Sequence, residues 1–87
     1  MYYVYVLQSL KDKKLYYGMT TDLEKRVKQH NKGKVKSTRS RRPLKIIYFE
    51  EAENRKKARS KEKYFKSGFG RKYIKNKIKL LAPSSNG

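Results

Sequence analysis

Three side chains able to handle a phosphate group fall within one short stretch, Leu15 to Asn31. Tyr16 brings a phenol, Arg26 a guanidinium and His30 an imidazole. The stretch is typical of a strand that runs through a glycine turn into an amphipathic helix, and Arg26 and His30 recur at a four-residue step on one stripe of that helix. We expect these groups to share one rim and to form the near half of an active site.

Local signals set the bounds of the predicted helix. Thr21 and Glu24 have the spacing of a capping box, in which two side chains satisfy backbone donors at a helix start. The helix is therefore expected to begin near Asp22, and Gly33 is suited to ending it. Its core-facing stripe is predicted to hold Leu23 and Val27.

The composition favours a small folded domain with a polyanionic partner. The 87 residues leave room for one domain, and the net charge of +18 points to nucleic acid before membrane. Eight Tyr and three Phe argue against a disordered basic tail. The chain has no cysteine, which suits the cytoplasm, and no apolar stretch near the roughly 20 residues that span a bilayer. We expect a cytoplasmic monomer or weak dimer.

Two strands are predicted ahead of the first helix. Tyr2 to Leu7 reads as a buried strand with Tyr5 on one face and Val4 and Val6 on the other. After a polar turn, residues 14–18 are expected to return antiparallel. Tyr5 and Tyr16 can then converge, provided that the register allows it.

Residues 32–45 are rich in Lys and Arg, lack acidic residues and are expected to form an exposed loop. Such a run is often only a solvated surface, but here it favours contacts to phosphates. The candidate nucleic-acid contacts are Lys32, Lys34, Lys36, Thr38, Arg39, Arg41 and Arg42.

The C-terminal half is predicted to hold one strand and two helices. Residues 45–50 read as a third strand, and Asn54 is suited to capping a helix that continues to about Gly68. Its apolar positions are Ala58, Phe65 and Phe69. A basic helix over 71–81 follows, with Ile74, Ile78 and Leu81 on one side, and residues 82–87 are expected to be a disordered tail to a single domain, 1–81.

Glu62 is the single acidic residue after Glu53, and it borders the apolar stripe of the second predicted helix. A carboxylate there is costly unless it is paired or bound to a cation. One alternative is a salt bridge to a basic neighbour. The other is a divalent ion, since Mg²⁺ keeps several waters and needs few protein ligands.

The remaining candidates also have a structural and a functional interpretation. Tyr5 and Tyr16 can be packed strand aromatics, or phenols that accept a proton from water in a strongly basic site. Arg26 can be a solvated helix residue, or a bidentate donor to a phosphate oxygen. His30 can lie on the surface, contact phosphate or shuttle a proton.

In the order and spacing of these motifs, residues 2–81 resemble the GIY-YIG nuclease superfamily, in particular its small standalone members. Residues 3–5 resemble the first signature tripeptide and residues 16–18 the second, while residues 20–26 resemble the helix that delivers the family arginine. Residues 30–33 with Thr38, Pro43, Tyr48 and Glu50 also match, and residues 58–66 match the helix of the metal-binding glutamate. Two positions depart from the pattern: Tyr3 stands where a glycine is named, and Met19 where some members have lysine.

The resemblance implies an α+β fold, a three-stranded antiparallel sheet flanked by helices in the order β-β-α-β-α-α. It implies hydrolysis of a phosphodiester with one divalent metal. Glu62 would hold Mg²⁺ or Mn²⁺, Arg26 would stabilise the phosphate, Tyr5 and Tyr16 would position or deprotonate water, and His30 would assist. The expected activity is a DNA endonuclease, acting on structured or damaged DNA as in DNA repair. The alternative is a non-catalytic nucleic-acid-binding module of the same fold.

Overall fold

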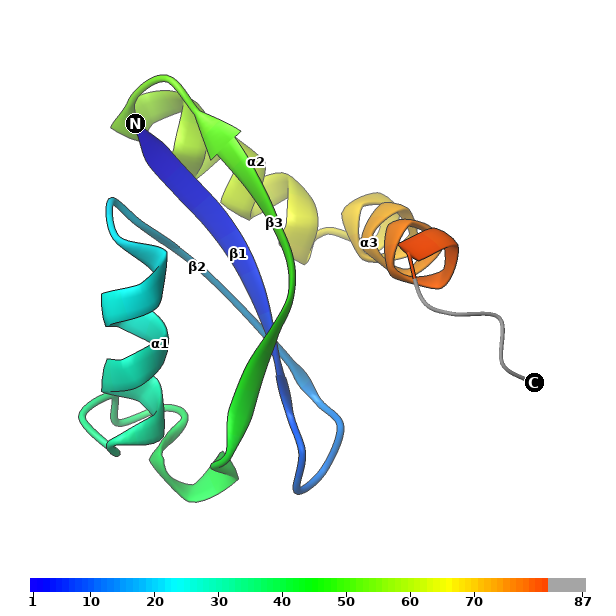
Figure 1. Ribbon diagram of the computed structural model, residues 1–87. Helices are drawn as coiled ribbons and strands as arrows, with labels where there is room; N and C mark the ends of the chain where they lie inside the picture. Colours follow the sequence, from blue (N-terminus) through cyan, green and yellow to red (C-terminus); the bar gives the residue numbers. More distant parts are fainter. Residues whose placement is uncertain (82–87) are drawn as a thin grey trace.

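Three antiparallel strands form the central sheet, and helices cover both of its faces (Figure 1). The computed structural model describes the backbone of residues 1–81 and the side chains of residues 1–77. The elements are β1 (Tyr2–Ser9), β2 (Leu15–Thr20), α1 (Leu23–Asn31), a short 3-10 helix η1 (Arg39–Arg41), β3 (Leu44–Ala52), α2 (Arg55–Lys66) and α3 (Gly68–Leu81). The predicted α+β fold and its element order are confirmed. The tail predicted at 82–87 lies outside the described residues.

β1 is the middle strand of the sheet, and both of its faces are buried. Val4 and Val6 pack into a cluster with side chains from α2 and α3, including Phe65 and Ile74. On the opposite face, Tyr5 and Leu7 form a second cluster with Leu44 of β3 and with Leu23 and Val27 of α1. The alternation predicted for β1 and the core-facing stripe predicted for α1 are thus confirmed.

The pairing of β1 with β2 fixes the register that the sequence left open. Tyr5 lies opposite Gly18, and Leu7 lies opposite Tyr16. Directly opposed residues point to the same face of a sheet, so Tyr5 and Tyr16 share the α1 face and Tyr17 lies on the other. β2 is an edge strand, because β1 is its single neighbour in the sheet. Residues of both faces can therefore be reached from this edge.

The ends of α1 are held by two different caps. Asp22 is the N-cap, and its side chain accepts a hydrogen bond from the Lys25 amide at 3.1 Å. The predicted Thr21–Glu24 capping box is therefore wrong: Asp caps as well as Thr, and Glu24 pairs with Lys28 instead. At the other end Gly33 has φ +80°, and the amides of residues 33 and 34 bond back to residues 30 and 29. This Schellman motif confirms Gly33 as the terminator.

The boundary between α2 and α3 differs from the prediction. Asn54 caps α2 as expected, accepting from the Lys57 amide at 2.9 Å. α2 ends at Lys66, however, because Ser67 is extended, and the Ser67 hydroxyl oxygen accepts from the Gly70 amide at the start of α3. Phe69 consequently belongs to α3 and is 82% exposed, so its placement on the apolar stripe of α2 is wrong.

α3 begins at Gly68 rather than at residue 71, and Ile74 is buried as predicted. The side chains of Ile78 and Leu81 lie outside the described part of the chain. Within residues 1–81, none of the helices is both long enough and apolar enough to cross a membrane.

Candidate active site

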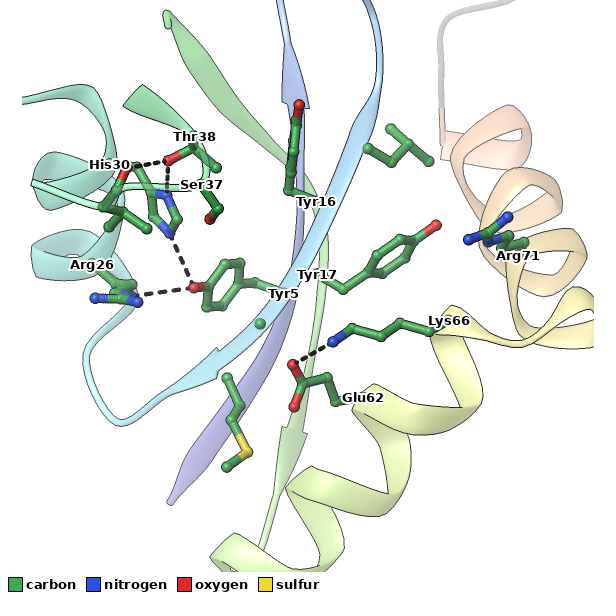
Figure 2. A pocket seen from close by; sticks show the side chains of 14 residues that line it. Tyr5, Tyr16, Tyr17, Arg26, His30, Ser37, Thr38, Glu62, Lys66 and Arg71 are labelled. Atoms are coloured by element: carbon green, nitrogen blue, oxygen red, sulfur yellow. Dashed lines mark hydrogen bonds and ion pairs between the residues drawn. The ribbon is translucent and has the colours of Figure 1, made fainter. Parts of the chain in front are cut away.

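A pocket of about 580 Å³ opens along β2, at the edge of the sheet. All five predicted catalytic residues line it, and they come from four elements: Tyr5, Tyr16, Arg26, His30 and Glu62. Figure 2 shows the Tyr5, Arg26 and His30 side chains on one side of β2, with Glu62 on the other. The edge strand thus joins two groups of polar side chains that belong to opposite faces of the sheet.

Gly18 makes room for Tyr5 in the pocket. A Cβ atom at residue 18 would lie 2.6 Å from Cζ of Tyr5 and closer still to its hydroxyl oxygen. That separation is far below a van der Waals contact, so any side chain at residue 18 would displace the phenol. The glycine of the second tripeptide, residues 16–18, therefore has a steric role. It leaves room for the ring of Tyr5, the tyrosine of the first tripeptide.

The Tyr5 hydroxyl belongs to a chain of hydrogen bonds. Arg26 Nε donates to the Tyr5 oxygen at 3.3 Å, and the Tyr5 hydroxyl lies 3.2 Å from His30 Nε2. His30 Nδ1 lies 2.7 Å from the Thr38 hydroxyl, which donates to the Val35 carbonyl at 3.5 Å. These directions assign the proton of the imidazole to Nδ1, so Nε2 is the acceptor for the Tyr5 proton.

His30 is 4% exposed, so it is not the surface residue that one alternative described. Burial lowers the pKa of His30 below 6.5, and the neighbouring Arg26 charge lowers this pKa further. The imidazole is therefore neutral at neutral pH and retains a free lone pair at Nε2.

Arg26 is held in place by two contacts. Its Nε bonds to Tyr5, and its Nη1 donates to the Gln29 side chain at 3.1 Å. The guanidinium is half-buried, and it has further N–H groups that could contact an anion in the pocket.

Glu62 supplies the carboxylate of the opposite side. Its side chain is 19% exposed, and Oε2 lies 3.3 Å from Nζ of Lys66, which is 54% exposed. The salt-bridge alternative is thus present as an i,i+4 pair. An i,i+4 pair whose lysine is open to solvent is worth only about 0.3–0.5 kcal/mol, so Lys66 is a weak competitor for another cation.

The donor set at Glu62 suits some metals and excludes others. Within the described residues, no group of three or more His, Cys, Asp or Glu side chains could hold a metal ion. This excludes a zinc site of the usual kind there, which takes three or four protein ligands. A single carboxylate suits Mg²⁺ or Mn²⁺, because these ions accept oxygen ligands and retain water.

Five of the seven predicted nucleic-acid contacts are exposed, and the other two have partners within the protein. Lys32, Lys34 and Lys36 are exposed, as are Arg39 and Arg42, whereas Arg41 forms an ion pair with Asp12 at 3.2 Å. Thr38 is 1% exposed and bonded to His30, so the expectation that the whole loop is exposed is wrong at that residue. η1 and the His30 contact fold this part of the loop inward.

Sequence reasoning missed four polar residues of the pocket: Tyr17, Ser37, Lys66 and Arg71. Burial raises the pKa of Tyr17, and the nearby Arg71 charge opposes this rise, so Tyr17 remains a phenol. Two signals could have found part of this set. Lys66 follows Glu62 at an i+4 step, and Tyr17 must face opposite to Tyr16 on a strand exposed at its edge.

Comparisons with known proteins find relatives that match nearly the whole chain. The UPF0213 protein CPE1444 of Clostridium perfringens is 46% identical, over 98% of this chain and 87% of its own length. The UPF0213 protein HQ_3675A of Haloquadratum walsbyi is 40% identical, over 93% of this chain and 85% of its own length.

The solution NMR structure of the UPF0213 protein BH0048 from Bacillus halodurans matches with a TM-score of 0.53 and 32% identity. The match covers 97% of this chain and 89% of that one. The family model described as the GIY-YIG catalytic domain matches residues 1–77, a range that includes every residue of the pocket. The chain therefore belongs to the GIY-YIG catalytic domain family.

Proposed function

We propose that this protein is a divalent-metal-dependent endonuclease that hydrolyses phosphodiester bonds in DNA. One observation carries the proposal: the hydrogen-bonded Tyr5 hydroxyl, the Arg26 guanidinium and the Glu62 carboxylate line the same pocket. Membership of the GIY-YIG family supports a nuclease, and the net charge of +18 supports a nucleic-acid substrate. Glu62 would hold Mg²⁺ or Mn²⁺, which when bound would supply positive charge to the phosphate oxygens.

The hydrogen-bond chain gives Tyr5 the stronger case as the proton-handling tyrosine. As Tyr5 takes a proton from the attacking water, its own proton can pass to neutral His30 Nε2, 3.2 Å away. Thr38 holds the imidazole in the orientation that presents Nε2 to the Tyr5 hydroxyl. Among the described residues, Tyr16 has no hydrogen bond of its hydroxyl to a comparable acceptor, so we assign it to positioning. Arg26 would bind the phosphate oxygen on which charge accumulates.

Nicking of supercoiled plasmid, with and without Mg²⁺ or Mn²⁺, tests the proposal. Labelled single-stranded and branched DNA and a matching RNA test the substrate class. The variant is Glu62→Gln, and Glu53→Gln is the matched control because Glu53 forms the same kind of i,i+4 pair, with Lys57, outside the pocket.

We expect metal-dependent nicking that Glu62→Gln abolishes and Glu53→Gln leaves intact. Equal activity of Glu62→Gln and wild type would contradict the assignment. Tight, salt-sensitive binding without cleavage of any substrate would favour the non-catalytic binding module instead.

A further inference from the structure

We propose that the β1–β2 turn and α3 form a second nucleic-acid contact surface, which holds a single-stranded segment beside the cleaved bond. The proposal deepens the function proposed for the pocket and rests on it. This α3 surface consists of Lys13, Lys14, Tyr17, Phe69, Arg71 and Lys75. None of its residues belongs to the basic loop 32–42, where sequence reasoning placed the nucleic-acid contacts, although the β1–β2 turn touches that loop through the Asp12–Arg41 ion pair.

The α3 surface continues directly from the candidate active site. A second hollow, of about 390 Å³, is lined by Lys13, Lys14, Leu15, Tyr17, Arg71 and Lys75. Leu15, Tyr17 and Arg71 line this hollow and the active-site pocket as well. In Figure 2 the Tyr17 side chain points from β2 towards Arg71. A strand bound in the pocket could therefore continue past these two residues without leaving the protein surface.

The second hollow has cationic residues on two sides and no carboxylate in its lining. Lys13 and Lys14 come from the turn, Arg71 and Lys75 from α3, and all four are exposed. Within residues 1–77, none of the four forms an ion pair. The nearby Asp12 carboxylate forms an ion pair with Arg41 and accepts a hydrogen bond from the Lys14 amide. Four gathered cations repel one another unless a polyanion neutralises them, and a phosphate backbone does so by releasing its counterions.

An aromatic side chain lies where the bases of such a strand could stack. Phe69 is 82% exposed and lines a third hollow together with Arg71 and Lys75. The ring therefore lies beside two of the cations of the α3 surface. A phenyl ring so exposed contributes little to the core. Cations that follow a backbone, with an aromatic ring beside them, form the pattern by which proteins hold single strands. In a duplex the bases are stacked on one another and unavailable to Phe69, which is why we assign a single-stranded segment.

The first test measures phosphate contacts in the Glu62→Gln background without divalent metal, so that no cleavage interferes. Fluorescence anisotropy of a labelled single-stranded oligonucleotide gives the dependence of log K on log[salt] for two variants of equal charge. Lys13→Gln/Lys75→Gln removes two cations of the α3 surface. Lys56→Gln/Lys63→Gln removes two exposed lysines of α2 that line none of these hollows.

We expect the slope of the first variant to be less negative by about 1.4, since each single-strand phosphate contact contributes about 0.7. The control should keep the parent slope, and equal slopes for the two variants would overturn the proposal. Tripolyphosphate that competes as well as the oligonucleotide, at equal phosphate concentration, would also overturn it, because the site would then recognise free anions.

The second test separates stacking from charge. Phe69→Ala should weaken single-strand binding about 5-fold or more, with an unchanged salt slope and little effect on a blunt duplex. Equal weakening for single strand and duplex, or none for either, would contradict the assignment. Both tests measure binding alone. The α3 surface can fail them while the protein still cleaves DNA. If the protein does not cleave DNA, the tests still show whether the α3 surface binds a single strand.

Discussion

Two carboxylates of this protein are buried to the same degree but have opposite surroundings. The side chain of Glu50, on β3, is 20% exposed, and that of Glu62, on α2, is 19% exposed. Glu50 accepts hydrogen bonds from Lys61 at 2.7 Å, from Tyr73 at 2.9 Å and from the Tyr48 hydroxyl. Among the described residues Glu62 has one partner, Lys66, with which it forms a weak ion pair.

The difference shows that burial alone does not separate a satisfied carboxylate from a candidate metal ligand. Burial by itself raises the pKa of Glu50, but the hydrogen bonds from Lys61, Tyr48 and Tyr73 outweigh this effect and lower the pKa below 4.5. Glu50 is thus a satisfied structural anion between β3, α2 and α3. Glu62 lines the candidate active-site pocket and keeps oxygen lone pairs available to a cation.

The largest expected contrast between the two carboxylates is in cleavage. Glu62→Gln should reduce the nicking rate at least about 100-fold, a loss typical of removing an electrostatic contact to the transition state. Glu50→Gln should keep most of the activity per folded molecule, because Glu50 does not line the pocket. Single-turnover nicking by the two purified variants, with folding checked by circular dichroism, measures the contrast. Similar losses of nicking rate in Glu62→Gln and Glu50→Gln would contradict the assignment of different roles to the two carboxylates.

The contrast reverses when stability is measured. Glu50→Ala should lower the free energy of unfolding by about 2 kcal/mol, because three donors lose a charged acceptor. Glu62→Ala should change it by less than about 0.5 kcal/mol, since the single lost i,i+4 pair has its Lys66 end open to solvent. Urea denaturation gives both values. Tyr73→Phe removes one donor to Glu50 and provides a milder variant should Glu50→Ala not fold.

Acid should remove the contribution of Glu50. Its folded pKa is lowered, so the stabilisation is fully present above the unfolded pKa near 4.5 and is lost as pH falls through the folded value. The difference in unfolding free energy between wild type and Glu50→Gln should therefore shrink as pH is lowered from 6 to 3. Urea denaturation at a series of pH values tests this, and a difference that stays constant with pH would contradict the assigned role.

The smallest expected effect concerns Lys66, the one partner of Glu62 among the described residues. Lys66→Met should leave the free energy of unfolding within about 0.5 kcal/mol of wild type. It should tighten Mn²⁺ binding about 2-fold, because the ion no longer competes with an ammonium group whose pair with the carboxylate is worth about 0.3–0.5 kcal/mol. Calorimetric titration of Mn²⁺ measures this, with Lys57→Met, which breaks the exposed Glu53 pair, as the control. Unchanged Mn²⁺ affinity would show that Lys66 does not restrict the site.

Much of the fold followed from local patterns in the sequence. The alternation in β1, the Asn54 cap and the Gly33 terminator are confirmed, because each depends on residues close together in the chain. Errors arose where two local signals competed. Thr21 and Asp22 are both suitable caps, and a serine between two helices was not recognised as a break.

The order of residues along the chain is enough to predict which chemical groups are present and which stripe or strand carries each of them. Three features come from the folded chain: Tyr5 lies opposite Gly18, Thr38 turns inward to His30, and Glu62 approaches β2 from the opposite face. The physical reason is that periodicity and capping act over a few residues. Strand register and the packing of helices on a sheet depend instead on contacts between segments far apart in the chain.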